Sequence, residues 1–278
     1  MPVRRSGRRC SGVTLVELLV AITLLGVIGS AAVAAIRMQA GIHRRVGARV
    51  TSAMQLHEAM APLVADLALL SPASGDIPPA GASDSTLDML ATVANGYLCA
   101  ISSPGTATLW LVSTAERGSG AAAGDSLFLH AGGTWRGARV AAASRVKVGG
   151  SPCDPALTGA TSLLRIVVDS TDLTWVRAGM AVRAARRIRY TLYRATDGST
   201  YLGLREWSHA TGRLSPAQPI AGPFDPASSR FAYLDSAGVP LAAPVATPTR
   251  IAAVQIRLEA TVRGLPGWSD STIVALRN

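Results

Sequence analysis

The hydrophobic pattern of the chain changes abruptly after residue 36. From Val13 to Ile36 nearly every side chain is apolar or small, and Glu17 is the only ionisable one. As a helix this run is about 36 Å long, which exceeds the roughly 30 Å hydrocarbon core of a bilayer. The pattern therefore predicts a membrane-spanning helix with one carboxylate near its start.

Residues 37–70 continue the helical period but become amphipathic. Pro62 lies inside this pattern and predicts either a kink or the last turns of the helix. The apolar positions recur at steps of three and four residues, at Ile42, Val46, Val50, Met54 and then His57 or Ala61.

After a segment rich in Pro, Gly, Ser and Asp at 71–86, the period changes to two. The clearest hairpin joins residues 187–193 to 201–207 through the turn residues Asp197 and Gly198. The clearest single strand is 250–263, where Val254, Ile256, Leu258, Ala260 and Val262 point to one side. Shorter strands are predicted at 109–112, 127–129, 164–168, 231–234 and 272–276. Strands separated by turns in this way predict an antiparallel sheet.

The residues before the apolar run decide what kind of anchor it is. Arg8-Arg9-Cys10-Ser11-Gly12 precedes the run, and Val13-Thr14-Leu15-Val16-Glu17 begins it. A secretory signal peptide has an apolar region of about 7–15 residues with the cleavage site after it, and this run is longer. An ordinary signal anchor accounts for the helix but not for a glutamate five residues after a glycine. The arrangement resembles the class III signal of type IV pilins and of the pseudopilins of type II secretion.

This resemblance implies a processing site and an assembly residue. A membrane peptidase would cleave between Gly12 and Val13 and methylate the new amine. Glu17 would then be the fifth mature residue, where it would pair with the Val13 amine of a neighbouring subunit and fix the axial register. The implied partners are prepilin peptidase, other pilin or pseudopilin subunits, an inner-membrane assembly platform and membrane lipid.

The resemblance also implies the orientation, which the charges do not. Arginines flank the apolar run on both sides, so the positive-inside rule gives nearly equal weight to each orientation. The family would have the leader in the cytoplasm and the globular part in the periplasm of a bacterium, as a single-pass inner-membrane protein that later enters a pseudopilus or a surface pilus.

The tail from Ala227 onward resembles the larger minor pilins of the W type, and less closely the J-type minor pseudopilins. A proline that many major pilins have at the position of Ala34 is replaced here, which also favours a minor subunit. The implied fold is α+β and pilin-like, with a long N-terminal helix packed on an antiparallel sheet. The implied segments are a leader (1–12), a transmembrane half-helix (13–36), an amphipathic half-helix (37–70), a loop (71–95) and a β-rich domain (96–278).

Composition agrees with one anchor and one globular region. The chain has 278 residues, of which 49% are hydrophobic and only 16% charged, which argues against disorder. The net charge is +10, and it falls to +6 once the four leader arginines are removed. That charge favours contact with anionic lipid, DNA or an acidic subunit without specifying one of them.

Two cysteines remain after the leader, which contains Cys10. Cys99 and Cys153 would face an oxidising space, where a disulfide is expected. The loop they would close spans about 55 residues and would contribute roughly 4 kcal/mol in the chain-entropy model. Two free buried thiols are the alternative.

The motifs for catalysis and metal binding are weak, so we predict no enzyme, cofactor or metal site. Gly124-Asp125-Ser126-Leu127 matches a nucleophile motif of lipases and esterases, but neither His130 nor His209 completes the Asp-x-x-His that this family also needs. The four histidines form no metal-binding spacing, and residues 169–172 lack the spacing of a cation loop.

Nucleic acid is the less favoured partner. Arg186, Arg187 and Arg189, near Tyr190 and Tyr193, resemble a basic and aromatic strand face, but most such faces are solvated sheet surfaces. The competing function is a membrane-anchored binding module, for DNA or as a surface adhesin, that does not polymerise.

Overall fold

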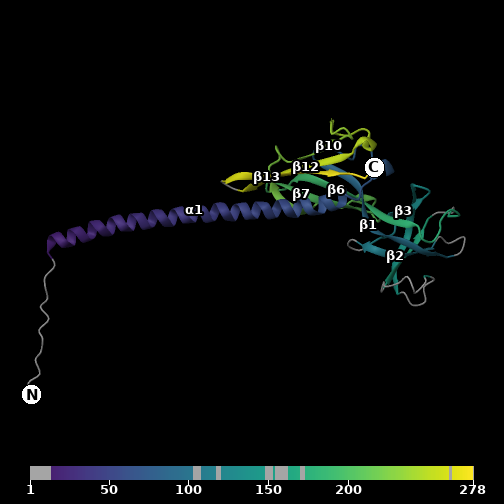
Figure 1. Cartoon of the computed structure of the whole chain (residues 1–278), viewed down its shortest axis with the longest axis horizontal. Helices are drawn as coiled ribbons and strands as arrows, with labels where there is room; N and C mark the ends of the chain where they lie inside the picture. The colour runs from purple at the N-terminus through teal and green to yellow at the C-terminus, as the bar shows by residue number, and fades with distance from the viewer. Residues whose placement is uncertain are drawn as a thin grey trace, which may run out of the picture. The chain divides into compact units, whose positions relative to one another are not determined.

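The computed structural model describes residues 14–102, 108–116, 120–147, 153, 162–169, 173–262 and 265–277. The leader and Val13 lie outside these residues. The helices are α1 (Leu15–Leu67), η1 (Pro72–Ser74) and η3 (Pro248–Arg250). The strands are β1 (Thr86–Ile101), β2 (Thr108–Glu116), β3 (Ser126–Ala131), β4 (Thr134–Lys147), β5 (Ser162–Val168), β6 (Ala181–Arg194), β7 (Thr200–Ser208), β8 (Arg213–Leu214), β9 (Gln218–Phe224), β10 (Arg230–Leu234), β11 (Pro240–Leu241), β12 (Ala253–Val262) and β13 (Leu265–Ala275). Figure 1 labels most of them.

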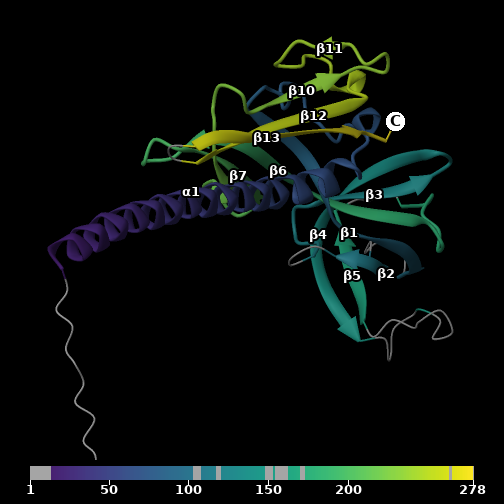
Figure 2. The same cartoon turned by 60° about the vertical axis from the view of Figure 1, so that its left-hand side comes forward.

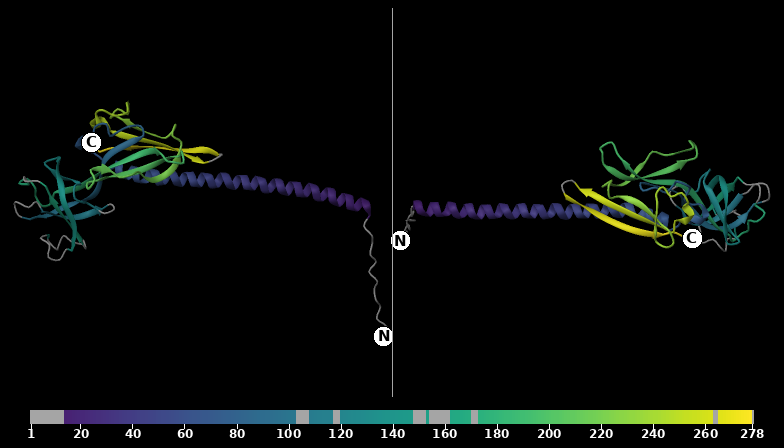
Figure 3. Two further views of the ribbon diagram at one scale, coloured as in Figure 1. Left: turned by 180° about the vertical axis from the view of Figure 1, so that it is seen from behind. Right: turned by 90° about the horizontal axis from the view of Figure 1, so that it is seen from above.

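The chain divides into two compact units, residues 1–51 and 52–278. In the first unit, α1 is apolar and bare: Leu15 is 78% exposed and Leu25 is 74% exposed. This helix, drawn in purple and blue in Figure 3, is long and apolar enough to cross a membrane.

The packed face of α1 begins later than the sequence predicts. Ile42, Val46, Val50 and Met54 form the predicted stripe, yet the structure leaves all four exposed. The buried positions of α1 are Ser52, Leu56, Ala59, Met60, Leu63, Asp66 and Leu67. The period of the pattern identifies side chains that share a face, but it does not say where along the helix a sheet covers that face. Pro62 lies in the last turns of α1, as one of the two alternatives expected.

The second unit holds an antiparallel sheet against the end of α1. β6 pairs with β7, β7 with β9 and β9 with β12, while β10 and β13 pair with β12. The predicted hairpin is β6–β7, and Gly198 in its turn has a φ of 81°. Val254, Ile256, Leu258 and Ala260 of β12 are fully buried, as their alternation predicts. The predicted α+β, pilin-like class is therefore confirmed.

A closed β-barrel interrupts this sheet, and the sequence did not predict it. β1 pairs with β2, β2 with β5, β5 with β4, β4 with β3, β3 with β6 and β6 again with β1. Figure 2 shows these strands in teal and green beside the main sheet. Closure leaves no free sheet edge within the ring. The barrel interior is apolar, and its large members include Leu98, Leu109, Leu111, Leu127, Leu129, Leu164, Ile166 and Val182.

Strands β1 and β6 are long because they belong to both layers. They pair from Thr86↔Thr191 to Tyr97↔Ala181, with a register shift between Thr92 and Ala94. A shift of this kind bends a strand and increases its twist. Ala91 belongs to the core under α1, whereas Val93 belongs to the barrel core, so the irregularity falls where the strand passes from one core to the other. The predicted loop at 71–95 therefore contains the first half of β1. The alternating residues of this half directly follow a polar, proline-rich segment, and the prediction extended the loop over them.

Candidate functional site: the start of helix α1

Helix α1 begins with a reciprocal cap between Thr14 and Glu17. The Thr14 backbone N–H donates to Glu17 Oε2 at 2.9 Å, and the Thr14 hydroxyl donates to the same oxygen at 3.0 Å. The Glu17 N–H in turn donates to the Thr14 hydroxyl at 3.3 Å. This is the capping-box pattern of a threonine followed three residues later by a glutamate, and it satisfies backbone donors that a helix start leaves free.

Within a single chain, the cap supplies hydrogen-bond donors to the one carboxylate in the apolar part of this helix. The neighbouring hydroxyls are satisfied inside the helix, since Thr23 donates to the Val20 carbonyl at 2.9 Å and Ser30 to the Val27 carbonyl at 2.8 Å. No other acidic residue occurs in the sequence before Glu58. Glu17 is thus a single negative charge on an apolar surface. An unpaired charge in that setting is costly in a bilayer, so its presence indicates a functional role.

The predicted processing residues, Gly12 and Val13, lie outside the described residues. The family model for the prokaryotic N-terminal methylation motif matches residues 7–33, which include both of them and the capped Glu17. The chain carries the signal of a type IV prepilin-like protein. No curated protein and no solved structure matches the chain.

The prepilin-like signal determines the general class of the protein. It implies processing by prepilin peptidase and assembly with other pilin-like subunits. Together with the exposed apolar helix, it indicates a single-pass, membrane-anchored protein. Pilin-like proteins that carry this signal form a structural class.

The basic residues of β6 are committed to ion pairs within the domain. Arg187 and Arg189 both donate to Asp88 Oδ2, at 2.6 and 2.7 Å, and Asp88 is only 1% exposed. Hydrogen bonds from Arg187 to this carboxylate raise the pKa of the guanidinium. Tyr190, expected beside them on an aromatic face, is buried. These contacts give the arginines a structural role, which weakens the case for a nucleic-acid surface on this strand.

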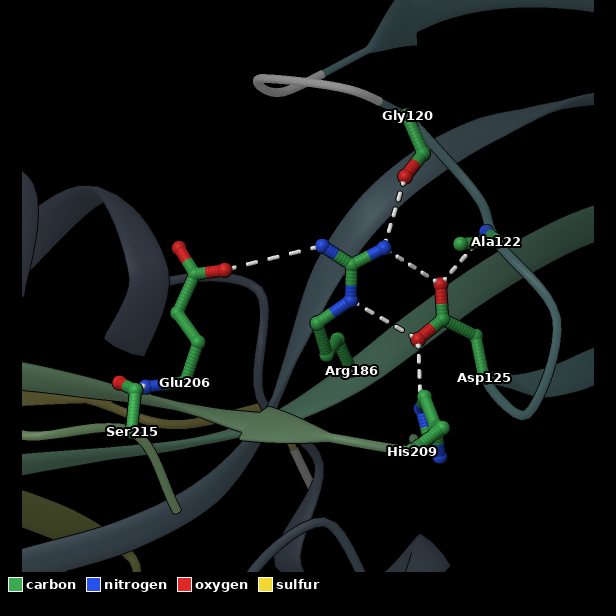
Figure 4. Close-up of polar contacts among 7 residues, drawn as sticks. All are labelled: Gly120, Ala122, Asp125, Arg186, Glu206, His209 and Ser215. Atoms are coloured by element: carbon green, nitrogen blue, oxygen red, sulfur yellow. Dashed lines mark hydrogen bonds and ion pairs between the residues drawn. The ribbon is translucent and has the colours of Figure 1, made fainter. Parts of the chain in front are cut away.

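A second buried carboxylate, Asp125, has polar contacts with three neighbouring residues (Figure 4). Arg186 donates to it from Nε at 2.9 Å and from Nη2 at 2.8 Å, and the Ala122 N–H donates at 2.8 Å. His209 Nε2 lies 3.1 Å from its Oδ1. The hydrogen bonds that Arg186 donates to Asp125 raise the pKa of the guanidinium. Glu206 lies 3.7 Å from the same guanidinium and completes the network.

This network gives Asp125 of the lipase-like motif a structural role. The motif contains both Asp125 and Ser126, but the described contact of the His209 ring is to Asp125, and Asp125 is occupied by Arg186. His209 lies 84 residues from Asp125 in the sequence, so no local signal could have paired them. Among the described residues, no group of three His, Cys, Asp or Glu side chains is arranged to hold a metal. Of residues 169–172, only Asp169 is described.

Cys99 and Cys153 are joined as a disulfide, with Cα atoms 5.4 Å apart. Cys99 lies on β1 and Cys153 is buried. The bond joins Cys153, which lies between β4 and β5 in the sequence, to strand β1 of the barrel.

Proposed function

We propose that the protein is a minor subunit of a type IV filament, either a minor pilin or a pseudopilin of a type II secretion pseudopilus. Prepilin peptidase cleaves it between Gly12 and Val13. The mature helix waits in the inner membrane with its globular domain in the periplasm, and an assembly platform then moves it into the filament.

The observation that carries this proposal is the isolated Glu17 charge. In the single chain its carboxylate accepts two hydrogen bonds from Thr14 and no counter-charge is described near it. The amine that cleavage creates at Val13 is one residue before Thr14. In a filament, the amine of a neighbouring subunit therefore supplies the missing positive charge, and the pair sets the axial register of the two helices.

Minor status is supported by the shape of the globular region. The barrel adds a second apolar core to the pilin-like sheet. A major subunit must repeat its contacts at every step of the filament, which a bulky added lobe disfavours. The departure at Ala34 points in the same direction.

The test is assembly of Glu17→Ala and Glu17→Gln in the native host. We expect both variants to accumulate in the membrane but to fall by about tenfold or more in sheared filaments, because each loses the charge pair. Glu58→Ala is the matched control, since Glu58 is the next acid on the same helix and is exposed. It should assemble normally.

The competing function, a membrane-anchored binding module that does not polymerise, predicts a different result. A plain anchor tolerates Glu17→Ala without loss of its surface activity. Equal recovery of wild type and Glu17→Ala in the filament fraction would reject the assembly role.

A further inference from the structure

A pocket of about 680 Å³ opens where the barrel meets the segment after α1. Strands β1, β2 and β6 contribute to its lining, together with the β3–β4 turn and the residues that follow α1. Its volume is within the range of small-molecule sites. The proposed role of the helix in filament assembly does not involve this pocket.

Two exposed aromatic rings line the pocket. Tyr97 is 57% exposed and Trp135 is 38% exposed. Aromatic residues make up only 5% of the chain, and among the described residues the only other strongly exposed one is Trp268. Exposed Tyr and Trp that share one concave surface indicate a binding site rather than chance, because each ring offers a large apolar face together with a polar tip.

Trp135 is held in place before any ligand arrives. Its ring lies 5.2 Å from the His130 ring, edge to face, and 5.7 Å from the Arg183 guanidinium. Arg183 itself is fixed by Asp76, to which it donates at 2.8 and 2.6 Å. A preorganised ring loses little entropy on binding.

Two buried polar atoms at the same pocket have no partner in the described structure. They are the Thr92 hydroxyl and Arg183 Nε. Buried polar groups are normally satisfied, so orphans of this kind need an explanation. Asn95 adds a donor: its side-chain oxygen accepts from the Thr114 hydroxyl at 3.0 Å, which leaves its amide NH₂ available.

Aromatic faces beside hydroxyl, amide and guanidinium groups match the chemistry of a sugar ring. The C–H face of a pyranose packs on an aromatic ring, while its hydroxyls both donate and accept hydrogen bonds. None of the described residues that line the pocket is acidic, which disfavours a cationic ligand. A nucleic acid needs several cations for its phosphates. Among the described lining residues, Arg183 is paired with Asp76, and Arg277 is the other cation. We propose that this pocket is a saccharide-binding site, with Tyr97 and Trp135 as stacking platforms.

The test uses full-length protein in phospholipid nanodiscs, applied to an array of neutral and acidic oligosaccharides. The oligosaccharides that bind most strongly are then titrated by calorimetry. We expect Tyr97→Ala and Trp135→Ala each to weaken that binding by about tenfold. Trp268→Ala removes an exposed tryptophan elsewhere and should leave binding unchanged.

Thr92→Val is the sharper variant. It replaces an unpartnered buried hydroxyl with a group of similar shape, so the melting temperature should stay the same or rise. We expect sugar affinity to fall by about fivefold all the same, because the hydroxyl turns towards the pocket to bond the sugar. No binding to any arrayed glycan, or binding that all three pocket variants retain, overturns the proposal. Variant-sensitive binding of an oligothymidylate without glycan binding overturns it in favour of nucleic acid. Filament assembly does not enter this test.

Discussion

The Tyr190 hydroxyl donates a hydrogen bond of 2.7 Å to Asp66 Oδ2, and both residues are buried. Asp66 lies near the end of α1, and Tyr190 lies in β6. The two residues are 124 positions apart in the sequence. The bond therefore fixes the end of the helix on the strand that the sheet shares with the barrel.

Tyr190→Phe tests the strength of this attachment. It leaves the Asp66 carboxylate buried with one donor fewer, so the free energy of unfolding should fall by about 2 kcal/mol, the range for hydrogen bonds to charged groups. Tyr193→Phe, on the same strand but only partly buried, should change it by less than about 0.5 kcal/mol. Denaturant unfolding followed by circular dichroism measures both. Equal values for the two variants would show that the bond contributes nothing specific.

Gly124 tests the contact between the barrel and the turn after β7. It has a φ of 90°, and an added Cβ would overlap the His209 ring. Gly133 has a similar φ of 82° with nothing near its Cβ position. Gly133→Ala should therefore cost about 1 kcal/mol for backbone strain alone, and Gly124→Ala should cost about 1–3 kcal/mol more because of the overlap.

The double variant Gly124→Ala/His209→Ala separates the two causes. Removing the ring should return the cost of Gly124→Ala towards that of Gly133→Ala, as thermal unfolding would measure. If His209→Ala gives no rescue, the overlap is not the reason for the loss.

The sequence predicted the parts of the fold whose signals are local. The β6–β7 hairpin was predicted from alternation around Asp197 and Gly198, and β12 from the alternation of Val254 to Ala260. The first part of α1 was predicted from the apolar run at 13–36. In each case neighbours in the sequence determine the structure.

Long-range pairing was not predictable in the same way. Asp76 was placed in a polar loop, yet it is fully buried because Arg183, 107 residues later, neutralises it. The barrel closes through β1–β6 pairing, which joins residues about as distant. Because each such partner lies outside any local window, the sequence showed polar loops and basic strands where the fold has ion pairs.

The disulfide between Cys99 and Cys153 provides a further prediction. Peptide mapping of the membrane-extracted protein without reductant should recover the two cysteines in one linked peptide. The paired variant Cys99→Ser/Cys153→Ser should lose about 4 kcal/mol of stability, since the cross-link closes a loop across 54 residues. Full alkylation of both thiols before reduction would contradict the bond.

The most direct test of the account is the N-terminal peptide of the membrane-extracted protein, determined by mass spectrometry. Prepilin processing predicts that it begins at Val13 with a methylated amine, the charge that Glu17 of a neighbouring subunit needs. A peptide that begins at Met1 or Pro2 would contradict that processing and make the helix an ordinary anchor.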